Sequence, residues 1–549
     1  MTRSYAMAGV AAAIVLAGCR GDNGSAAVET FQNPTVIASS NGELHTRLTL
    51  ARGTTSIDGR TVTSNLWNGS YTPPVLKLSP GDTLFLELDN QADESSNVHY
   101  HGLNVSPRVN SDATVSDNIF VLVEPGQKLQ YKVALPATHN SGLYWYHSHR
   151  HELAQRQVMG GLSGGIVIDG VLDPFPQLAG IKERILLLKD IQITAQGTIP
   201  ENIDPSAPST RLVNGQVNPT MLIRPNETQF LRFANIGSDQ YYRITLDGHL
   251  FYEVARDGNR HTQLMPTDEL LLPPGARSEV LIQGGEAGRY ALRAHAFNTG
   301  PAGDSYPDAK LATLVSQGFA DTRIPLPTGF PAVTDLRALP VAKKRTITFD
   351  ESSDGNTFYI DSGDGPKQFD ANRVDSTIAA GTVEEWTVLN ATAELHVFHI
   401  HQTDFQVTER NGVAQPFVGH QDSVNVDFQA SANAPPGQVK ILIDFRNPDI
   451  VGKFVYHCHI LEHEDGGMMA VAAVVPAVVA ALSDLPGTLV RAVNRAVGRP
   501  DPLTVARIDQ TLEALQAGSF CKTAPASASP PKLDLRKLLQ ANLAARRGG

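Results

Sequence analysis

Histidine is the most informative residue type in this chain, because its imidazoles occur in tight groups. The chain has 17 histidines, and ten of them lie in four short segments, the last of which also contains a cysteine. Imidazole and thiolate are the ligands that soft and borderline transition metals prefer. A single His-X-His pair is usually an ordinary pair of strand residues, but four such segments in one chain predict metal sites. The segments are His99-Tyr100-His101, His147-Ser148-His149, His396 to His401, and His457 to Met468.

The last segment can serve two metal sites at once. In an extended strand His457 and His459 point to one side and Cys458 points to the other. A thiolate with two imidazoles and a weak thioether is the ligand set of a blue-copper electron-transfer site. The partners available to Cys458 are His396, His463 and Met468, with Met469 as the alternative thioether.

Eight histidines of the four segments remain for a second site. Half of them lie in the first third of the chain and half in the last third. We therefore expect a metal cluster at an interface between the first and the last domain, which requires the chain to fold back on itself. These eight are His99, His101, His147, His149, His399, His401, His457 and His459.

An internal repeat indicates which elements position these ligands. A turn followed by an alternating apolar segment that ends in Asn occurs three times with one internal spacing, from Gly81 to Asn90, from Asn226 to Asn235 and from Gly381 to Asn390. Alternation of period two is typical of strands, and short strands between Gly/Pro turns are typical of Greek-key β-sandwiches. The repeat predicts three similar domains.

The sequence thus predicts an all-β protein of three consecutive β-sandwich domains. The middle domain supplies no obvious ligand, so we expect it to act as a spacer. After the third domain the pattern stops, and the tail, which contains Cys521, carries no recognisable activity. The predicted domains are residues 41–172, 182–320 and 341–478, followed by a tail over 483–549.

The first residues favour export. Residues 1–18 combine Arg3 with a short apolar run, as in a signal peptide, and Leu16-Ala17-Gly18-Cys19 resembles the bacterial lipoprotein box. We expect lipid on Cys19 to attach the protein to a membrane, a tether over residues 19–40, and a periplasmic or cell-envelope location. A formal charge of −11 and a pI near 5.9 argue against a nucleic-acid partner.

With its four motifs complete and in order over residues 41–475, the chain resembles the three-domain multicopper oxidases, the family of laccases, bilirubin oxidases and periplasmic cuprous oxidases. The resemblance implies cupredoxin-like domains and four copper ions per chain, one of type 1, one of type 2 and two of type 3. It implies His396, Cys458, His463 and Met468 at the type 1 copper, His99 and His399 at the type 2 copper, and the two sets His101, His147, His459 and His149, His401, His457 at the type 3 coppers.

The resemblance also implies a reaction. Family members take single electrons from a reductant at the type 1 site and reduce O₂ to water at the trinuclear cluster, and the peptide neighbours His457 and His459 give Cys458 a short bonded route to that cluster. We expect phenols or aromatic amines as reductants, with cuprous or other metal ions as the alternative. Enzymes specialised for cuprous ion carry a methionine-rich insert, whereas this chain has seven methionines and no such cluster.

Water formation consumes protons, so a carboxylate near the cluster is expected to relay them. Asp112 and Asp117 both lie in the loop where relatives place such an acid, and the sequence does not distinguish them. Glu464 and Asp465 directly follow a type 1 histidine, and we expect them either to pull protons or to attract cationic reductants to its edge.

Overall fold

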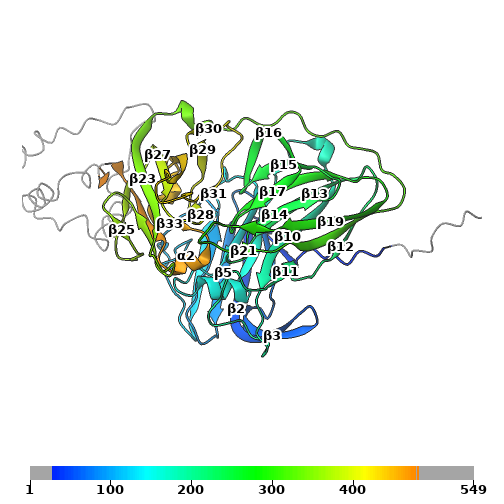
Figure 1. Cartoon of the computed structure of the whole chain (residues 1–549), viewed down its shortest axis with the longest axis horizontal. Coiled ribbons are helices and arrows are strands. Elements are labelled where there is room, and N and C mark those ends of the chain that lie inside the picture. The colour runs from blue at the N-terminus through cyan, green and yellow to red at the C-terminus, as the bar shows by residue number, and fades with distance from the viewer. Residues whose placement is uncertain (1–26, 478, 481–549) are drawn as a thin grey trace, which may run out of the picture.

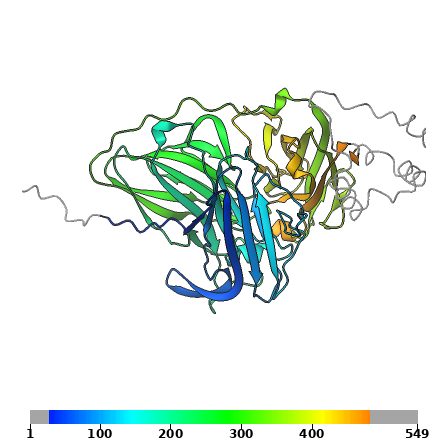
Figure 2. The same cartoon turned by 180° about the vertical axis from the view of Figure 1, so that it is seen from behind.

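The computed structural model describes residues 27–477 together with 479 and 480, which form three β-rich domains (Figures 1 and 2). The middle domain, green, lies beside the third, yellow to orange, and the first domain, blue to cyan, lies against both. The three domains confirm the all-β fold. The predicted signal peptide, Cys19 and the whole predicted tail over 483–549, with Cys521, lie outside the described residues.

The first domain is a sandwich of two sheets, ordered β3-β2-β5-β7 and β1-β4-β9-β8-β6. Its core takes alternate residues from both sheets, such as Leu84 and Leu86 of β5 against Tyr146 of β8. Its elements are β1 (Val36–Ala38), β2 (Glu43–Ile57), β3 (Arg60–Trp67), β4 (Val75–Leu78), β5 (Thr83–Asn90), β6 (His99–His101), β7 (Lys128–Ala134), β8 (Gly142–His147), α1 (Ala154–Gly160) and β9 (Ser163–Ile168), with a 3₁₀ turn, η1 (Pro176–Leu178), after it.

The middle domain repeats this plan with sheets ordered β11-β10-β13-β18-β15-β16 and β12-β22-β19-β14-β17, plus the small pair β20-β21. Its strands are β10 (Lys182–Ile191), β11 (Thr210–Val213), β12 (Thr220–Ile223), β13 (Thr228–Asn235), β14 (Tyr242–Leu246), β15 (Phe251–Arg256), β16 (Asn259–Thr267), β17 (Glu269–Leu272), β18 (Arg277–Gln283), β19 (Gly288–His295), β20 (Phe297–Asn298), β21 (Ser305–Tyr306) and β22 (Ala309–Ser316).

The third domain has sheets ordered β25-β24-β23-β27-β32-β29-β30 and β26-β34-β33-β28-β31. Its elements are η2 (Leu336–Ala338), β23 (Val341–Glu351), β24 (Phe358–Asp361), β25 (Pro366–Lys367), β26 (Ser376–Ala379), β27 (Val383–Asn390), β28 (His396–Ile400), β29 (Phe405–Arg410), β30 (Val413–Ala414), β31 (Ser423–Val426), β32 (Gly437–Asp444), η3 (Pro448–Ile450), β33 (Gly452–Cys458), α2 (Leu461–Asp465) and β34 (Met469–Val475).

The repeated sequence pattern corresponds to the equivalent strand in each of the three domains. Its alternating segment is β5, β13 or β27, and each of these strands pairs in parallel with the first long strand of its domain, which is β2, β10 or β23. The Asn that ends each repeat is fully buried, and its amide donates to two backbone carbonyls further along the chain. Asn90, Asn235 and Asn390 therefore satisfy carbonyls that burial would otherwise leave without donors.

Residues 27–40 are attached to the folded domains and do not form the tether that the sequence suggested. Phe31 belongs to the core of the middle domain, and Glu29 forms an ion pair with Arg184 at 2.5 Å. Residues 36–38 form β1, which pairs in parallel with β4. This segment, whose composition is small and polar, is therefore attached to the first and middle domains by side-chain contacts and by strand pairing.

Among the described residues, no helix combines the length and apolar character needed to cross a membrane.

Candidate metal centres

Two strand pairs, one in each outer domain, position the histidines. In the first domain β6 and β8 are antiparallel and place His99 opposite His147. In the third domain β28 and β33 are antiparallel and place His399 opposite His457. Cross-strand neighbours on one face lie about 5 Å apart, so each pair of strands presents a compact group of imidazoles.

The first and third domains meet through these imidazoles. His101 Nδ1 lies 3.0 Å from His459 Nε2, and His149 Nε2 lies 3.4 Å from His457 Nε2. The rings of His99 and His401 stack with centroids 3.8 Å apart. None of the eight predicted cluster histidines is more than 2 % exposed, so the chain folds back as the sequence predicted.

The nitrogen donors of the cluster fit a group of metal ions. In each of three triads the ligand nitrogens lie within 4.8 Å of one another, and the first two triads share His101: His99, His101, His399; His101, His147, His459; and His149, His401, His457. Several buried nitrogens have no hydrogen-bond partner, among them His99 Nε2, His147 Nε2 and His399 Nε2. Buried polar atoms without a partner are costly, and an inward-facing lone pair on each imidazole suits a metal ligand.

Burial keeps these imidazoles in the form that binds metals. It lowers the pKa of His147 to about 3 and that of His457 to about 4, and lowers the pKa values of the other six well below the usual range. A neutral imidazole has a free lone pair, whereas a protonated one cannot ligate. The cluster is therefore ready for metal at neutral pH.

A separate group surrounds the cysteine. Cys458 Sγ lies 3.6 Å from His396 Nδ1 and 3.5 Å from His463 Nδ1, and these two nitrogens are 3.0 Å apart. Burial raises the pKa of the Cys458 thiol well above its ordinary value. A bound metal deprotonates a coordinating thiol, so this buried thiol and two facing imidazoles also fit a metal ion.

The structure separates the two candidate thioethers. Met468 is fully buried in the same apolar cluster as Cys458, and its backbone carbonyl accepts from the Cys458 N–H at 3.1 Å. Met469 begins β34 and belongs to a different cluster, with Val455 and Val471. Met468 is therefore the methionine on the cysteine side.

Of the acids considered from the sequence, only one in the first loop reaches the cluster. Asp117 is buried with Oδ1 2.9 Å from His99 Nδ1. Burial raises the pKa of Asp117 to about 7. Asp112 is exposed and pairs with Lys132 at 3.0 Å, so its candidacy as a relay acid was wrong.

Glu464 and Asp465 do not form an acidic edge at the cysteine site. Glu464 is buried, with Oε1 3.3 Å from His149 Nδ1 and Oε2 3.2 Å from His457 Nδ1, and burial raises its pKa well above the usual range. Asp465 accepts from the backbone N–H groups of Ala154 and Gln155 at the start of α1. The expectation of a surface role at the His463 edge was wrong, whereas Glu464 remains a candidate for proton handling.

Three polar residues at the cluster were not found from the sequence. Gln402 directly follows a cluster histidine, is 1 % exposed, and donates from Nε2 to Asp117 Oδ2 at 2.6 Å. Asp422 Oδ1 lies 3.2 Å from His101 Nε2, and Arg277 of the middle domain makes a bidentate contact with Asp422. Gln402 adopts a left-handed backbone conformation with φ = 61°. No sequence signal marks Asp422 or Arg277.

The middle domain is therefore more than a spacer. Among the described residues, no histidine of the middle domain belongs to the metal groups, but Gly275 lies against the cluster. A Cβ at Gly275 would come within 3.0 Å of His459 Cδ2 and 3.1 Å of His101 Cε1.

The fold and the two ligand groups define a metal-binding oxidoreductase class in which a thiolate site and a histidine cluster share one strand. Models of the multicopper oxidase family match residues 49–171, 187–318 and 338–478, one for each domain. The chain belongs to the multicopper oxidase family, so it is a copper-dependent oxidoreductase.

Individual proteins show the same similarity. The chain is 26 % identical to the multicopper oxidase mco of Staphylococcus haemolyticus, over 73 % of this chain and 82 % of the relative. It is 28 % identical to the cell division protein FtsP of Escherichia coli, over 75 % and 86 %. Among solved structures it resembles a multicopper oxidase of Campylobacter jejuni described as a metallo-oxidase, with a TM-score of 0.69 and 25 % identity over 81 % of this chain and 94 % of that chain.

Proposed function

We propose that the thiolate group holds the type 1 copper and that the histidine cluster holds one type 2 and two type 3 coppers. The support is the separation of the ligands into two groups by the alternation along β33. The ligands would be His396, Cys458, His463 and Met468 for type 1; His99 and His399 for type 2; and His101, His147, His459 and His149, His401, His457 for the type 3 pair. Copper supplies one-electron redox chemistry when bound.

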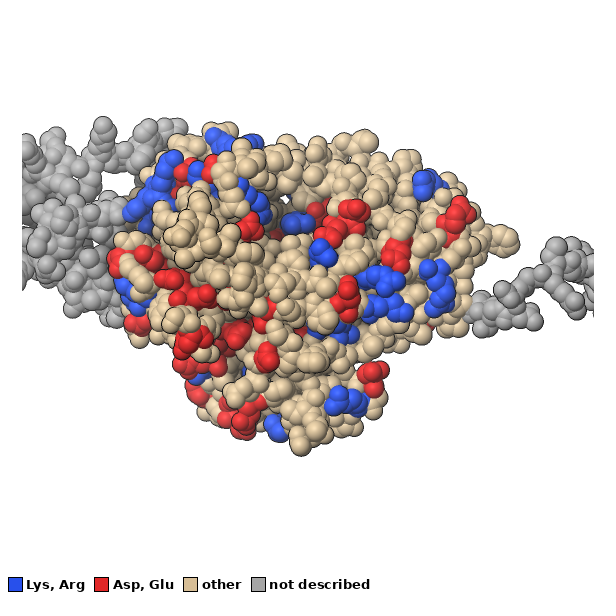
Figure 3. Space-filling model, viewed as in Figure 1, with Lys and Arg blue, Asp and Glu red and all other residues tan. Residues whose placement is uncertain are grey.

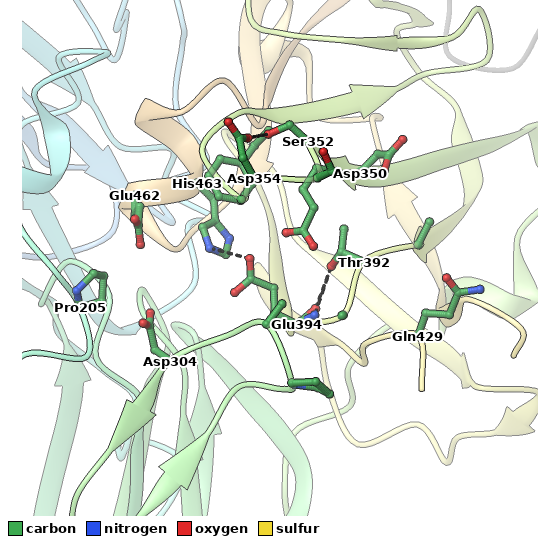
Figure 4. Close-up of a pocket in the computed structure, with 18 of the residues that line it drawn as sticks. Pro205, Asp304, Asp350, Ser352, Asp354, Thr392, Glu394, Gln429, Glu462 and His463 are labelled. Atoms are coloured by element: carbon green, nitrogen blue, oxygen red, sulfur yellow. Dashed lines mark hydrogen bonds and ion pairs between the residues drawn. The ribbon is translucent and has the colours of Figure 1, made fainter. Parts of the chain in front are cut away.

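The proposed reaction is the oxidation of phenols or aromatic amines coupled to the reduction of O₂ to water. The observation that carries it is a cleft of about 920 Å³ between the middle and third domains, lined in part by His463 (Figure 4). The Nδ1 atom of His463 faces Cys458, while Nε2 lies on the cleft side, 3.3 Å from Glu394. A small reductant in this cleft would contact the outer edge of an imidazole whose inner nitrogen lies beside the thiolate.

The charge of the cleft favours a second candidate, the oxidation of metal cations. Acidic side chains gather on this face of the molecule (Figure 3), and the cleft is lined by Asp204, Asp304, Asp350, Glu351, Asp354, Glu394 and Glu462. Figure 4 shows Glu394, Glu462 and Asp304 arranged around His463. Burial raises the pKa of Glu394 to about 9 and that of Glu462 to about 8, so a bound cation would displace protons from these two carboxyls.

We also propose that Asp117 and Glu464 handle the protons that water formation consumes. Both carboxylates lie against cluster histidines, Asp117 at His99 and Glu464 at His149 and His457. Asp117 would hold or release its proton at the oxygens between His99 and Gln402. A general acid must lie within hydrogen-bond reach of the group it serves, and Asp112 does not meet this condition.

The test compares reductants of different charge on the copper-loaded full chain. A cationic aromatic diamine, a neutral phenol, an anionic aromatic donor and cuprous ion are each followed by oxygen uptake at low and at high ionic strength. At about 0.15 M salt, interactions between exposed charges are screened over a length of about 8 Å. If the acidic cleft is the docking site, added salt should therefore slow oxidation of the cationic donors and speed oxidation of the anionic donor. The variant D304N/E351Q should show the same changes without salt, whereas the matched control D112N, an exposed acid elsewhere, should not. Equal salt responses of all donors would exclude the cleft, and oxygen uptake by a Cys458→Ser chain would refute the thiolate site.

We further propose that the chain is exported and carries lipid on Cys19, which would attach it to a membrane of the cell envelope. The support is the sequence Leu16-Ala17-Gly18-Cys19 after a short apolar run. Replacement of Cys19 by Ala should release the protein from the membrane fraction. A wild-type protein that is already free of membranes would refute the anchor.

A further inference from the structure

The orientation of one cluster histidine needs an explanation that the copper ligands themselves do not give. In His99, His147 and His399 the outer partner is at Nδ1, and Nε2 is the buried nitrogen without a partner. His101 is turned the other way. Its Nε2 faces Asp422 Oδ1 at 3.2 Å and its Nδ1 faces His459 Nε2 at 3.0 Å. Something on the Nε2 side must therefore hold an acceptor in place.

That acceptor is held by the middle domain. Arg277, at the start of β18, donates from Nη1 to Asp422 Oδ1 at 2.8 Å and from Nη2 to Asp422 Oδ2 at 2.7 Å. Both side chains are completely buried. A bidentate arginine contact fixes the plane of a carboxylate as well as its position, so the Asp422 oxygen that faces His101 cannot rotate away.

The same guanidinium also contacts the first domain. Arg277 Nε donates to the Leu143 carbonyl at 3.1 Å, and its guanidinium carbon lies 5.6 Å from the ring centroid of Tyr144. Its backbone N–H donates to Asp257 Oδ1 at 2.8 Å. One side chain of the middle domain thus joins a carbonyl of the first domain to a carboxylate of the third, directly beside the histidines that those two domains share.

We propose that Arg277 is a positioning residue for the trinuclear copper site. Its bidentate contact fixes Asp422, and Asp422 accepts the Nε2–H of His101. This hydrogen bond holds His101 in the tautomer and orientation that present Nδ1 to the metal. Partners of this kind typically change metal affinity 10- to 100-fold when they are removed. The middle domain would thus contribute to copper binding through Asp422 and His101, an inference that rests on the ligand assignment made above.

The test is copper binding by the full chain with Arg277→Lys, which keeps the positive charge but loses the bidentate contact with Asp422. The matched control is Arg232→Lys. Arg232 is also a buried arginine of the middle domain, pairs with Glu279 at 2.6 Å, and is in no ion pair or hydrogen bond with a cluster histidine. Copper is measured as metal per chain and as apparent affinity in competition with a chelator, and the blue absorption of the thiolate site reports independently on the third domain.

We expect Arg277→Lys to keep the blue absorption while the affinity for the cluster coppers falls about 10- to 100-fold, and Arg232→Lys to retain all copper. Wild-type affinity in Arg277→Lys would overturn the proposal, and so would equal copper loss in both variants, which would show general loosening of the domains. Should Arg277→Lys fail to fold, the pair Arg277→Gln/Asp422→Asn removes the two charges of this contact together. There too, cluster copper must bind more weakly than in the wild type, since an amide without the bidentate contact is free to turn. A wild-type chain that holds no cluster copper would instead overturn the ligand assignment and this proposal together.

Discussion

Replacing Gly275 by alanine should disturb the histidine cluster from the middle domain without replacing a ligand. Gly275 has φ = 86°, and a Cβ there would lie 3.0 Å from His459 Cδ2 and 3.1 Å from His101 Cε1. Ordinary contacts of this kind begin at 3.4 Å, so the two rings must move by about 0.3–0.4 Å. Metal–ligand distances tolerate only about 0.2 Å, so the displacement is large enough to weaken binding of the copper that these two histidines are proposed to share.

The backbone strain of this substitution must be separated from the contact. Alanine in the left-handed region costs about 1–2 kcal/mol wherever it occurs. Gly381 provides the matched control, because its φ is 85° and a Cβ there would meet nothing within 4 Å. Both variants should lose similar stability in urea unfolding of the copper-free protein.

Only Gly275→Ala should lose cluster copper and oxygen uptake, while its blue absorption stays normal. The assay is copper per chain together with oxygen consumption on the reconstituted protein. Full copper content and normal turnover in Gly275→Ala, at a stability equal to that of Gly381→Ala, would refute the close packing of the middle domain against the cluster.

Three further substitutions or conditions have defined outcomes. Asp117→Asn should slow oxygen reduction about 10²- to 10⁴-fold, the usual contribution of a positioned acid, whereas Asp112→Asn should leave turnover unchanged; comparable rates for both would remove Asp117 from the proton path. Met468→Leu should raise the reduction potential of the blue site, because a thioether stabilises the oxidised state, and Met469→Leu should not, which a redox titration of the blue absorption decides. Burial lowers the pKa of His147 to about 3, against about 6.5 in an unfolded chain. Between these pH values the unfolded chain binds more protons than the folded chain. This group therefore makes the copper-free protein less stable as pH falls from about 6.5 to about 3. Urea unfolding at several pH values measures the trend, and stability that rises on acidification would contradict the buried neutral imidazoles.

Local spacing was enough to predict which side chains the structure brings together. The alternation at His457, Cys458 and His459 depends only on the geometry of an extended strand, and β33 has that geometry. The repeat likewise predicted the strands β5, β13 and β27, because turn, alternation and terminal Asn are all local properties.

Chain direction after a strand could not be predicted in the same way. The sequence interpretation treated Glu464 as a continuation of the edge at His463, but both residues lie in the short helix α2. Successive residues of a helix point about 100° apart, so His463 faces Cys458 while Glu464 faces the cluster. Asp112 and Asp117 were indistinguishable for a similar reason, because a loop carries no periodicity that indicates which acid turns inward.

The contacts made by Asp422 and Arg277 had no sequence signal at all. They lie far apart in the chain and belong to different domains, and nothing in their local sequence distinguishes them from ordinary strand-end residues. Only the docking of three domains brings them to His101, so their role follows from the tertiary structure alone.

The strand β33 lies between β28 and β34 in its sheet, and it carries Cys458 with a cluster histidine on the same strand. All ligands of the thiolate group belong to the third domain, whereas the histidine cluster is divided between two domains. Gentle heating or dilute denaturant that loosens the domain contacts should therefore empty the centres in sequence. The oxygen-reducing metals would leave first, and a protein that is still blue but no longer consumes oxygen would remain as an intermediate.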